Sequence, residues 1–345
     1  MKAIDFFCGA GGLTRGLSLA GIDVIAGIDI DSKCGQTYAF NNTAEFWNAD
    51  VASITKQDII NRYPDLTTSN ESILFAGCAP CQPFSKQRRS RKDEYDRKIL
   101  LQFGRIIEEF KPSWVLVENV PGISHANKDT PINEFLNILG SCKYNFVKSI
   151  LNAKEYGVPQ NRYRFVLIAS RNCEVSLPLK THGHGLRAFK TVRDTISKYP
   201  PIAAGHAHPT LLNHVSASLS DLNHKRMINT PPDGGDRRCW PEKLVLRCHK
   251  SYKGHTDVYG RMFWDKPAPT LTSKCISISN GRFGHPVQNR AISLREAAAL
   301  QGFPDNYIFF GSLQSIARQI GNSVPVQLAK ILGQHIVALD VDCSV

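Results

Sequence analysis

The sequence predicts an α/β fold with a mostly parallel sheet, joined to a second, smaller and loop-rich domain. Residues 1–175 alternate short apolar runs with amphipathic stretches, which is the βα pattern of such a sheet. Residues 176–290 hold 10 of the 19 prolines and 9 of the 11 histidines, with few long periodic segments. That composition is typical of a module that contacts its substrate through loops.

The periodicity also assigns individual elements. We expect helices at 13–20, closed by Gly21, and at 98–110. Helical patterning returns at Leu294, and 326–339 is expected to be a terminal helix. The apolar runs that predict strands are 3–7, 24–28, 73–76, 114–117 and 165–168.

The composition is that of a globular protein, because 42% of the 345 residues are hydrophobic and 21% are charged. No apolar run approaches the roughly 18 to 20 residues that a membrane-spanning helix needs. The N-terminus lacks the basic region, apolar stretch and cleavage site of a secretion signal. Ten cysteines are too few for a disulfide scaffold. We therefore expect a soluble intracellular protein with reduced thiols.

The net charge of +12 is concentrated in one third of the chain. Residues 176–290 hold 18 Lys and Arg against 7 Asp and Glu, whereas the remainder holds 24 against 23. Because neutralisation of phosphates drives nucleic-acid affinity, this excess favours a surface for a polyanion. A generically basic protein would carry an even spread.

The first motif joins a strand to a helix through the glycine-rich turn Asp-Phe-Phe-Cys-Gly-Ala-Gly-Gly at 5–12. Glycines let the backbone approach a ligand, and the helix N-terminus offers unpaired N–H groups. Asp29 and Asp31 end the next strand, where an acid can accept both hydroxyls of a ribose. A tight packing turn and a dinucleotide site are alternatives. The spacing differs from the dinucleotide fingerprint, however, and favours another nucleoside cofactor.

The second motif, Gly-Cys-Ala-Pro-Cys-Gln-Pro-Phe-Ser at 77–85, directly follows a predicted strand. Cys78 and Cys81 form a C-x-x-C pair, so dithiol, zinc and inert-cysteine interpretations compete. The other cysteines do not complete a familiar zinc spacing, and we expect no metal. Since the proline-flanked turn projects Cys81 into the crevice where α/β proteins bind ligands, the nucleophile interpretation is favoured.

Two further motifs carry charged side chains. Glu118 ends a strand, where a partly protonated carboxyl can act as an acid toward a ring nitrogen or form a surface ion pair. Arg162 and Arg164 alternate as they enter a strand and would share one face. They could contact an anion or form structural salt bridges.

Taken in order, these motifs resemble the cytosine-C5 DNA methyltransferase family of bacterial and phage restriction–modification systems. The resemblance covers almost the whole chain outside roughly 180–255. It rests on Phe-Cys-Gly-Ala-Gly-Gly at 7–12, Pro-Cys-Gln-Pro-Phe-Ser at 80–85, Glu-Asn-Val at 118–120, Gln-Asn-Arg-Tyr-Arg at 160–164, Arg-Glu-Ala-Ala-Ala-Leu-Gln-Gly-Phe-Pro at 295–304 and Gln-Ile-Gly-Asn-Ser-Val-Pro at 319–325.

The resemblance implies a Rossmann-like domain that binds S-adenosyl-L-methionine as the methyl donor. Ile30 stands where the family often has an aromatic residue against the adenine, which weakens that contact. The two prolines that usually precede the nucleophile are Ala79-Pro80 here. The positions that match the family's cofactor pocket are Phe7, Gly9, Gly11, Asp29, Ile30, Asp50, Pro80, Leu100, Asn322 and Val324.

The resemblance also implies a mechanism in which Cys81 is the nucleophile. Cytosine C5 accepts a methyl group only after a thiolate adds at C6, with a proton or hydrogen bond from Glu118 at N3. Arg162 and Arg164 would steady the ring carbonyl and nearby phosphates. Because C6 is inaccessible in a stacked duplex, the cytosine must be flipped out of a specific double-stranded sequence. Cys78 is expected to be a small apolar filler.

The resemblance places DNA contacts in two regions. Residues 86–98, with 7 basic and 3 acidic side chains, match a loop that closes over DNA, and a solvated loop without function is the alternative. The basic region matches the family's target-recognition region. The residues expected to contact DNA are Ser85, Lys86, Arg88, Arg89, Gln160 and Thr270.

The expected organisation follows from these assignments. Residues 1–178, completed by 312–345, form the catalytic and cofactor-binding domain, 179–290 form the basic target-recognition domain, and 291–311 form a connecting helix region. We expect a monomer in the bacterial cytoplasm or nucleoid, with double-stranded DNA as partner and no membrane contact. A cognate restriction endonuclease, where the system has one, would act separately. The alternatives are a tRNA cytosine-C5 methyltransferase and an inactive DNA-binding relative, although the chain keeps both Cys81 and Glu118.

Overall fold

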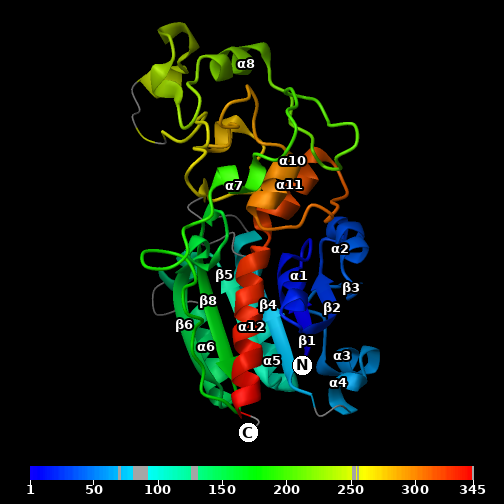
Figure 1. The fold of residues 1–345 in the computed structure, drawn as a ribbon. Helices are drawn as coiled ribbons and strands as arrows, with labels where there is room; N and C mark the ends of the chain where they lie inside the picture. The colour runs from blue at the N-terminus through cyan, green and yellow to red at the C-terminus, as the bar shows by residue number, and fades with distance from the viewer. Residues whose placement is uncertain (69–70, 81–91, 126–130, 251–253, 255, 344–345) are drawn as a thin grey trace. The chain divides into compact units, whose positions relative to one another are not determined.

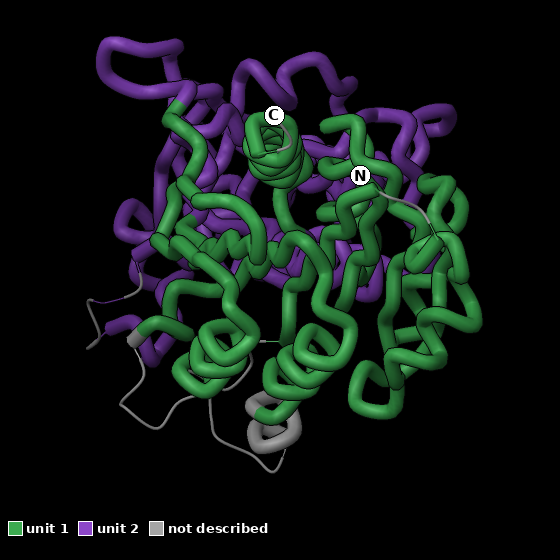
Figure 2. The backbone as a smooth tube through the Cα atoms, turned by 90° about the horizontal axis from the view of Figure 1, so that it is seen from below, with its two compact units in different colours: residues 1–152, 163–180, 324–345 green, residues 153–162, 181–323 purple. Residues whose placement is uncertain are grey.

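A computed structural model describes residues 1–68, 71–80, 92–125, 131–250, 254 and 256–343. The chain divides into two compact units, coloured separately in Figure 2. Unit 1 comprises Met1–Asn152, Tyr163–Lys180 and Val324–Val345, and unit 2 comprises Ala153–Arg162 and Thr181–Ser323. Each unit is described by itself.

The units differ from the expected domains mainly at residues 291–323. These residues belong to unit 2, because helices α10 (Leu294–Leu300) and α7 (Val192–Ile196) pack together and α11 (Leu313–Asn322) packs on α10. The expected boundary at 178 lies two residues from the end of a segment of unit 1 at Lys180.

Among the described residues of unit 1, seven strands form one sheet in the order β3-β2-β1-β4-β5-β8-β6 (Figure 1). Neighbouring strands are parallel except at β8, which runs antiparallel to both β5 and β6. The predicted mostly parallel sheet is confirmed, but the direction of β8 and the strands β3 and β6 were not predicted. The strands are β1 (Lys2–Phe6), β2 (Asp23–Asp29), β3 (Glu45–Asn48), β4 (Ile73–Gly77), β5 (Trp114–Asn119), β6 (Asn145–Asn152) and β8 (Tyr163–Ser170).

Helices cover both faces of this sheet (Figure 1). On one face α1 (Gly12–Leu19) packs against α12 (Val326–Cys343), and Gly16 permits this contact because a Cβ there would collide with Ala329. On the other face α5 (Lys92–Phe110) packs against α6 (Pro131–Ser141). The central strands are therefore buried on both sides, as their nearly continuous apolar runs require.

The remaining elements are short. Unit 1 also contains α2 (Gly35–Asn41), α3 (Lys56–Arg62), α4 (Asp65–Thr68) and the 3-10 helices Ser32–Cys34 and Pro121–His125. Unit 2 also contains α8 (Asp221–Ile228), α9 (Arg247–Lys250), the paired strands β7 (Gln160–Asn161) and β9 (Ala268–Pro269), and the 3-10 helices Ala153–Tyr156, Arg237–Cys239, Glu242–Leu244 and Ile278–Asn280. No helix of the described residues has both the length and the apolar character to cross a membrane.

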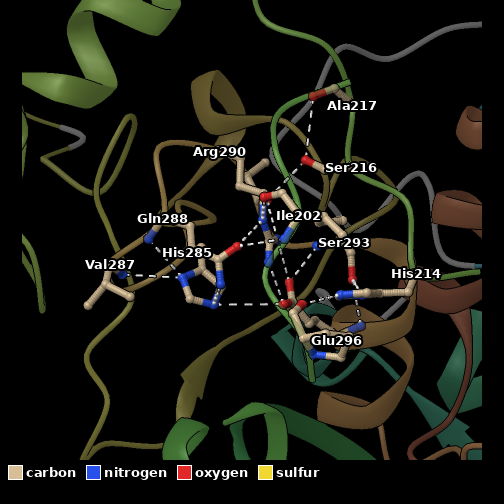
Figure 3. Close-up of polar contacts among 12 residues, drawn as sticks. Ile202, His214, Ser216, Ala217, His285, Val287, Gln288, Arg290, Ser293 and Glu296 are labelled. Atoms are coloured by element: carbon tan, nitrogen blue, oxygen red, sulfur yellow. Dashed lines mark hydrogen bonds and ion pairs between the residues drawn. The ribbon is translucent and has the colours of Figure 1, made fainter. Parts of the chain in front are cut away.

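Buried polar side chains hold the loops of unit 2 together. Figure 3 shows Arg290 donating to both carboxylate oxygens of Glu296, at 2.7 Å each. Arg261 is also fully buried and donates to the carbonyl oxygens of four residues, Met227, Thr230, His285 and Gln288. Such bonds replace a large apolar core, because they satisfy the backbone of irregular segments.

Burial of arginine side chains reduces the positive charge that unit 2 presents at its surface. Within 176–290, Arg226, Arg237, Arg261 and Arg290 are buried. These four guanidinium groups bind protein carbonyls or carboxylates, so they do not contribute to a DNA-binding surface. Only part of the positive charge of this region is therefore available to phosphates.

Unit 1 contains a disulfide between Cys173, just after β8, and Cys343, at the end of α12. Their Cα atoms are 5.8 Å apart. The structure therefore pairs two cysteines that the sequence analysis expected to be free thiols. Sequence could not indicate it, because the two residues are 170 positions apart.

Candidate active site

The strand order reverses beside β1, which lies between β2 and β4. In such sheets, ligands bind outside the carboxyl ends of the strands at the point of reversal. The glycine-rich turn follows β1, Cys78 follows β4, and Glu118 lies near the end of β5. The backbone N–H of Cys78 donates to the carbonyl of Phe6 at 3.2 Å, which joins the first two of these strand ends.

The glycine-rich turn has the backbone that its composition predicts. Gly9 and Gly11 have φ angles of 52° and 83°, in the region that favours glycine. A Cβ on Gly9 would meet nothing within 4 Å, so the turn is open on that side. Phe7, also at positive φ, packs edge-on against Phe103 at 6.0 Å between ring centroids.

Asp29 supports this turn directly. Its Oδ2 accepts from the backbone N–H of Gly9 and its Oδ1 from that of Asp31, each at 2.8 Å. Burial raises the pKa of Asp29, while these hydrogen bonds act in the opposite direction. The acid expected to bind a ribose therefore also orients the backbone of the turn.

Asp5 is a functional candidate that the sequence analysis did not select. Its carboxyl group is fully buried, and Oδ2 accepts from the backbone N–H of Thr14 at 3.0 Å and from its hydroxyl at 2.6 Å. Within the described part of the chain, Oδ1 has no hydrogen-bond partner. Burial raises the pKa of Asp5 to about 7, although the bonds from Thr14 lower it. An acidic residue in an otherwise apolar strand was the signal that could have found it.

Asp5 predicts a pH dependence of stability. Because its pKa is raised in the folded state, its contribution is fully present below about pH 4 and lost as the pH rises through about 7. Between pH 5 and pH 8, the free energy of unfolding of the wild type should fall by about 2 kcal/mol more than that of Asp5→Asn. Urea unfolding at both pH values measures this difference. Asp23→Asn, at an exposed carboxylate, is the control, and parallel pH curves for Asp5→Asn and wild type would contradict the prediction.

The other expected cofactor residues have varied environments. Ile30 is 61% exposed, which leaves its side chain accessible to a ligand. Asp50 is half-buried and accepts from the backbone N–H of Ala52 at 2.9 Å, whereas Leu100 is buried in the core. Pro80 is exposed, after β4.

The last two expected cofactor residues fall in different units. Asn322 is exposed at the end of α11 in unit 2. Val324 is buried and opens the last segment of unit 1. The boundary between the two units therefore runs between these two neighbouring positions.

Glu118 forms the centre of the site in unit 1. Its side chain is 2% exposed, and its Oε1 forms an ion pair with Nε of Arg164 at 3.0 Å. The thiol of Cys78 donates to Oε2 at 2.9 Å. The neighbouring Asn119 donates from Nδ2 to the carbonyl of Ala79 at 3.2 Å, which anchors the turn after β4. The expectation that Cys78 only fills space is therefore wrong.

Arg162 and Gln160 belong to unit 2 and are buried there. Arg162 donates to the carbonyls of Leu271 at 2.7 Å and Gly321 at 3.0 Å. The amide of Gln160 donates to Gln301 Oε1 at 2.6 Å. Both side chains therefore stabilise the protein backbone and its neighbours, which differs from the expected contacts with the ring and with DNA.

Thr270 has a similar local role, because its hydroxyl donates to the carbonyl of Asn161 at 2.8 Å. Five further expected site residues, Cys81, Ser85, Lys86, Arg88 and Arg89, lie outside the described residues.

The geometry fits a methyl donor of the S-adenosylmethionine type. The open turn at Gly9 leaves room for its backbone contacts, and the Asp29 carboxylate lies within hydrogen-bond distance of that turn. A mostly parallel sheet with this turn after β1 and an acid near the end of β5 fits a Rossmann-like methyltransferase class.

Comparisons with known proteins specify the class. The family model described as C-5 cytosine-specific DNA methylase matches residues 1–338, so the chain belongs to this family. The protein is a DNA cytosine-5-methyltransferase that uses a methyl donor of the S-adenosylmethionine type.

Relatives support the assignment over nearly the whole chain. The Type II methylase M.HgiDII of Herpetosiphon aurantiacus is 39% identical over 339 residues, covering 96% of this chain and 94% of that protein. The Type II methyltransferase M1.HphI of Haemophilus parahaemolyticus is 28% identical, with coverages of 98% and 87%. A crystal structure described as that of a prophage DNA modification methyltransferase (E. coli) shares the fold, with a TM-score of 0.78, 22% identity and 99% coverage of both chains.

Proposed function

We propose that this enzyme transfers the methyl group of S-adenosyl-L-methionine to C5 of a cytosine flipped out of a specific double-stranded DNA sequence, through a covalent bond between Cys81 and C6. The observation that carries this proposal is the Glu118 carboxyl, buried at the end of β5 and held by groups from two other segments. When bound, the methyl donor supplies an electrophilic methyl group.

The residues would divide the chemistry as follows. The Cys81 thiolate adds to C6, while Glu118 donates a proton to N3, and C5 gains the electron density it needs to accept the methyl group. After transfer, C5 loses its proton to a base, the Cys81 thiolate leaves C6 and the N3 proton returns to Glu118. These steps restore the aromatic ring and the enzyme. Arg164 would hold the Glu118 carboxyl and contact the base, and Arg162 would act indirectly through the backbone it binds.

Binding of the methyl donor would use the turn after β1. We assign the backbone contacts to Phe7, Gly9 and Gly11, and the ribose to Asp29. The remaining pocket positions in the proposal are Ile30, Asp50, Pro80, Leu100, Asn322 and Val324.

DNA would be held by residues of two kinds. Ser85, Lys86, Arg88 and Arg89 follow the nucleophile in sequence, and the exposed Lys and Arg side chains of unit 2 would bind phosphates. We further propose a monomer that works in the bacterial cytoplasm, beside a cognate endonuclease like that implied by the Type II names of its relatives.

Bisulfite sequencing of DNA from a methylation-free bacterial host that expresses the protein tests the proposed function. We expect 5-methylcytosine at one position of a recurring sequence. Methylation scattered without a common sequence would contradict the proposed specificity, and its absence with soluble, folded protein would contradict the DNA activity.

Glu118→Gln should slow methyl transfer by about 10²- to 10³-fold, because the amide keeps the size of the side chain but lacks the titratable proton. Single-turnover transfer of labelled methyl groups to duplex DNA measures the rate, and gel-shift titration should give unchanged affinity. Glu134→Gln, at an exposed position of α6, is the control. An unchanged rate would leave Glu118 with a structural role only.

A further inference from the structure

Among the described residues, the Glu118 carboxyl group has an ion pair at one oxygen and a hydrogen bond at the other, and the two partners come from different segments. Nε of Arg164, in β8, lies 3.0 Å from Oε1, and Sγ of Cys78, directly after β4, lies 2.9 Å from Oε2. Because β4 and β8 lie on opposite sides of β5, these two contacts restrain the carboxyl group from both directions.

The position of Cys78 is itself restrained. Its backbone N–H donates to the carbonyl of Phe6, and the next residue, Ala79, accepts from the amide of Asn119. A side chain at the preceding Gly77 would press against Phe103, so this segment has little room to shift. The thiol therefore meets Glu118 in a defined geometry and does not merely occupy a gap.

The chemistry of the two partners suits an acid that must release its proton. A guanidinium group has donors only, and a thiol is a weak donor and a weak acceptor. Neither partner competes strongly with the nitrogen of a base for a proton on Glu118. A strong acceptor in the place of Cys78 would hold that proton.

We propose that Cys78 is a positioning residue, which orients the Glu118 carboxyl toward the base through its S–H···Oε2 hydrogen bond. This proposal rests on the proposed role of Glu118 as the acid at N3. Cys78 touches neither the base nor the methyl donor in this scheme and acts only through Glu118.

The test compares variants with and without a donor at position 78. Cys78→Ala and Cys78→Val both remove the donor, and valine also retains apolar volume. Cys78→Ser keeps a donor within reach of Oε2. Cys142→Ala, which removes a buried thiol elsewhere in unit 1, is the matched control.

The first readout is the exchange of the C5 hydrogen of cytosine in duplex DNA without the methyl donor. Exchange requires thiolate addition at C6 and protonation at N3, so it isolates the step in which Glu118 acts. Since a thiol is a weak hydrogen-bond donor, its loss should have a moderate effect, and we expect the alanine and valine variants to exchange about 10-fold more slowly. The serine and Cys142 variants should stay within about 2-fold of wild type.

The second readout separates kcat from KM in steady-state methylation. The donor-free variants should lose kcat, while the KM values for DNA and methyl donor remain unchanged. Equal losses of kcat in the serine, alanine and valine variants would overturn the proposal. They would show that the packing of the Cys78 side chain matters and that its hydrogen bond does not. A rise in KM with unchanged kcat would overturn it as well.

Glu118→Gln distinguishes a failure of the proposed acid role of Glu118 from a failure of the positioning role of Cys78. If it exchanges the C5 hydrogen at the wild-type rate, the acid role of Glu118 fails and the role of Cys78 falls with it. If Glu118→Gln exchanges the C5 hydrogen slowly while Cys78→Ala and Cys78→Val exchange it at the wild-type rate, only the role of Cys78 is overturned.

Discussion

Cys81→Ser is expected to lose DNA methylation by at least about 10³-fold, because an unactivated hydroxyl group is a far weaker nucleophile than a thiolate. The serine variant should also fail to form a covalent adduct with DNA containing 5-fluorocytosine, from which the wild-type enzyme cannot be released. Transfer of labelled methyl groups and denaturing gels measure the two effects.

The control for this variant is Cys239→Ser, which removes an exposed thiol of unit 2 and should leave both activities unchanged. Circular dichroism should show that Cys81→Ser remains folded. A serine variant that retains more than a tenth of the wild-type turnover would refute Cys81 as the nucleophile.

Glu296→Ala is expected to lower the free energy of unfolding by about 3–5 kcal/mol, because it leaves a buried guanidinium group without its counter-charge. Arg290 is 0% exposed and Glu296 is 1% exposed. The carboxylate accepts two hydrogen bonds from Arg290 and one from the backbone N–H of Ser293 at 2.7 Å, which completes the capping box of α10.

Histidines next to this pair add no charge. Burial lowers the pKa of His285 to about 4, and its Nδ1 accepts from the backbone N–H groups of Val287 and Gln288. Burial also lowers the pKa of His214, which contacts the hydroxyl of Ser293 (Figure 3). Its Nε2 lies 2.8 Å from the carbonyl oxygen of Pro200. The counter-charge of Glu296 is therefore Arg290, and the neighbouring histidines do not replace it.

Urea unfolding of the full chain tests this prediction. Glu242→Ala removes an exposed partner of Lys250 and should change stability by less than about 1 kcal/mol. Burial alone would raise the pKa of Glu296, but the bonds and charge of Arg290 lower it overall. Its contribution is therefore present above the ordinary glutamate pKa and lost as the pH falls, so Glu296→Ala and wild type should converge in acid. A loss below 1 kcal/mol at neutral pH would contradict the prediction.

Local patterns were sufficient to predict the central parallel strands of unit 1 and the edge of the sheet at which its motifs gather. The apolar runs around Ile4, Phe75 and Val115 are buried strands, and their spacing with amphipathic helices requires parallel pairing. Since parallel strands end at the same edge, the turn after β4 and Glu118 of β5 were expected to lie in one crevice, with Cys81 as the thiol that enters it.

The partners of individual side chains depended on packing between distant segments. Arg162 and Arg164 share an alternating pattern, yet one binds carbonyls of unit 2 and the other the carboxylate of Glu118. Burial of Gln160 has the same origin, because its partner Gln301 is 141 positions away. Periodicity indicates which face a residue occupies but carries no information about what covers that face.

By itself, therefore, the sequence determined the apolar strands at the centre of the sheet and, through its motifs, the methyltransferase family. The tertiary structure alone decided that β8 runs antiparallel, that four basic side chains of 176–290 are buried, and that the thiol of Cys78 meets Glu118. The physical reason is the range of the interactions. Turn and strand patterns arise from neighbours along the chain, whereas hydrogen bonds and ion pairs form between segments that meet only after the chain has folded.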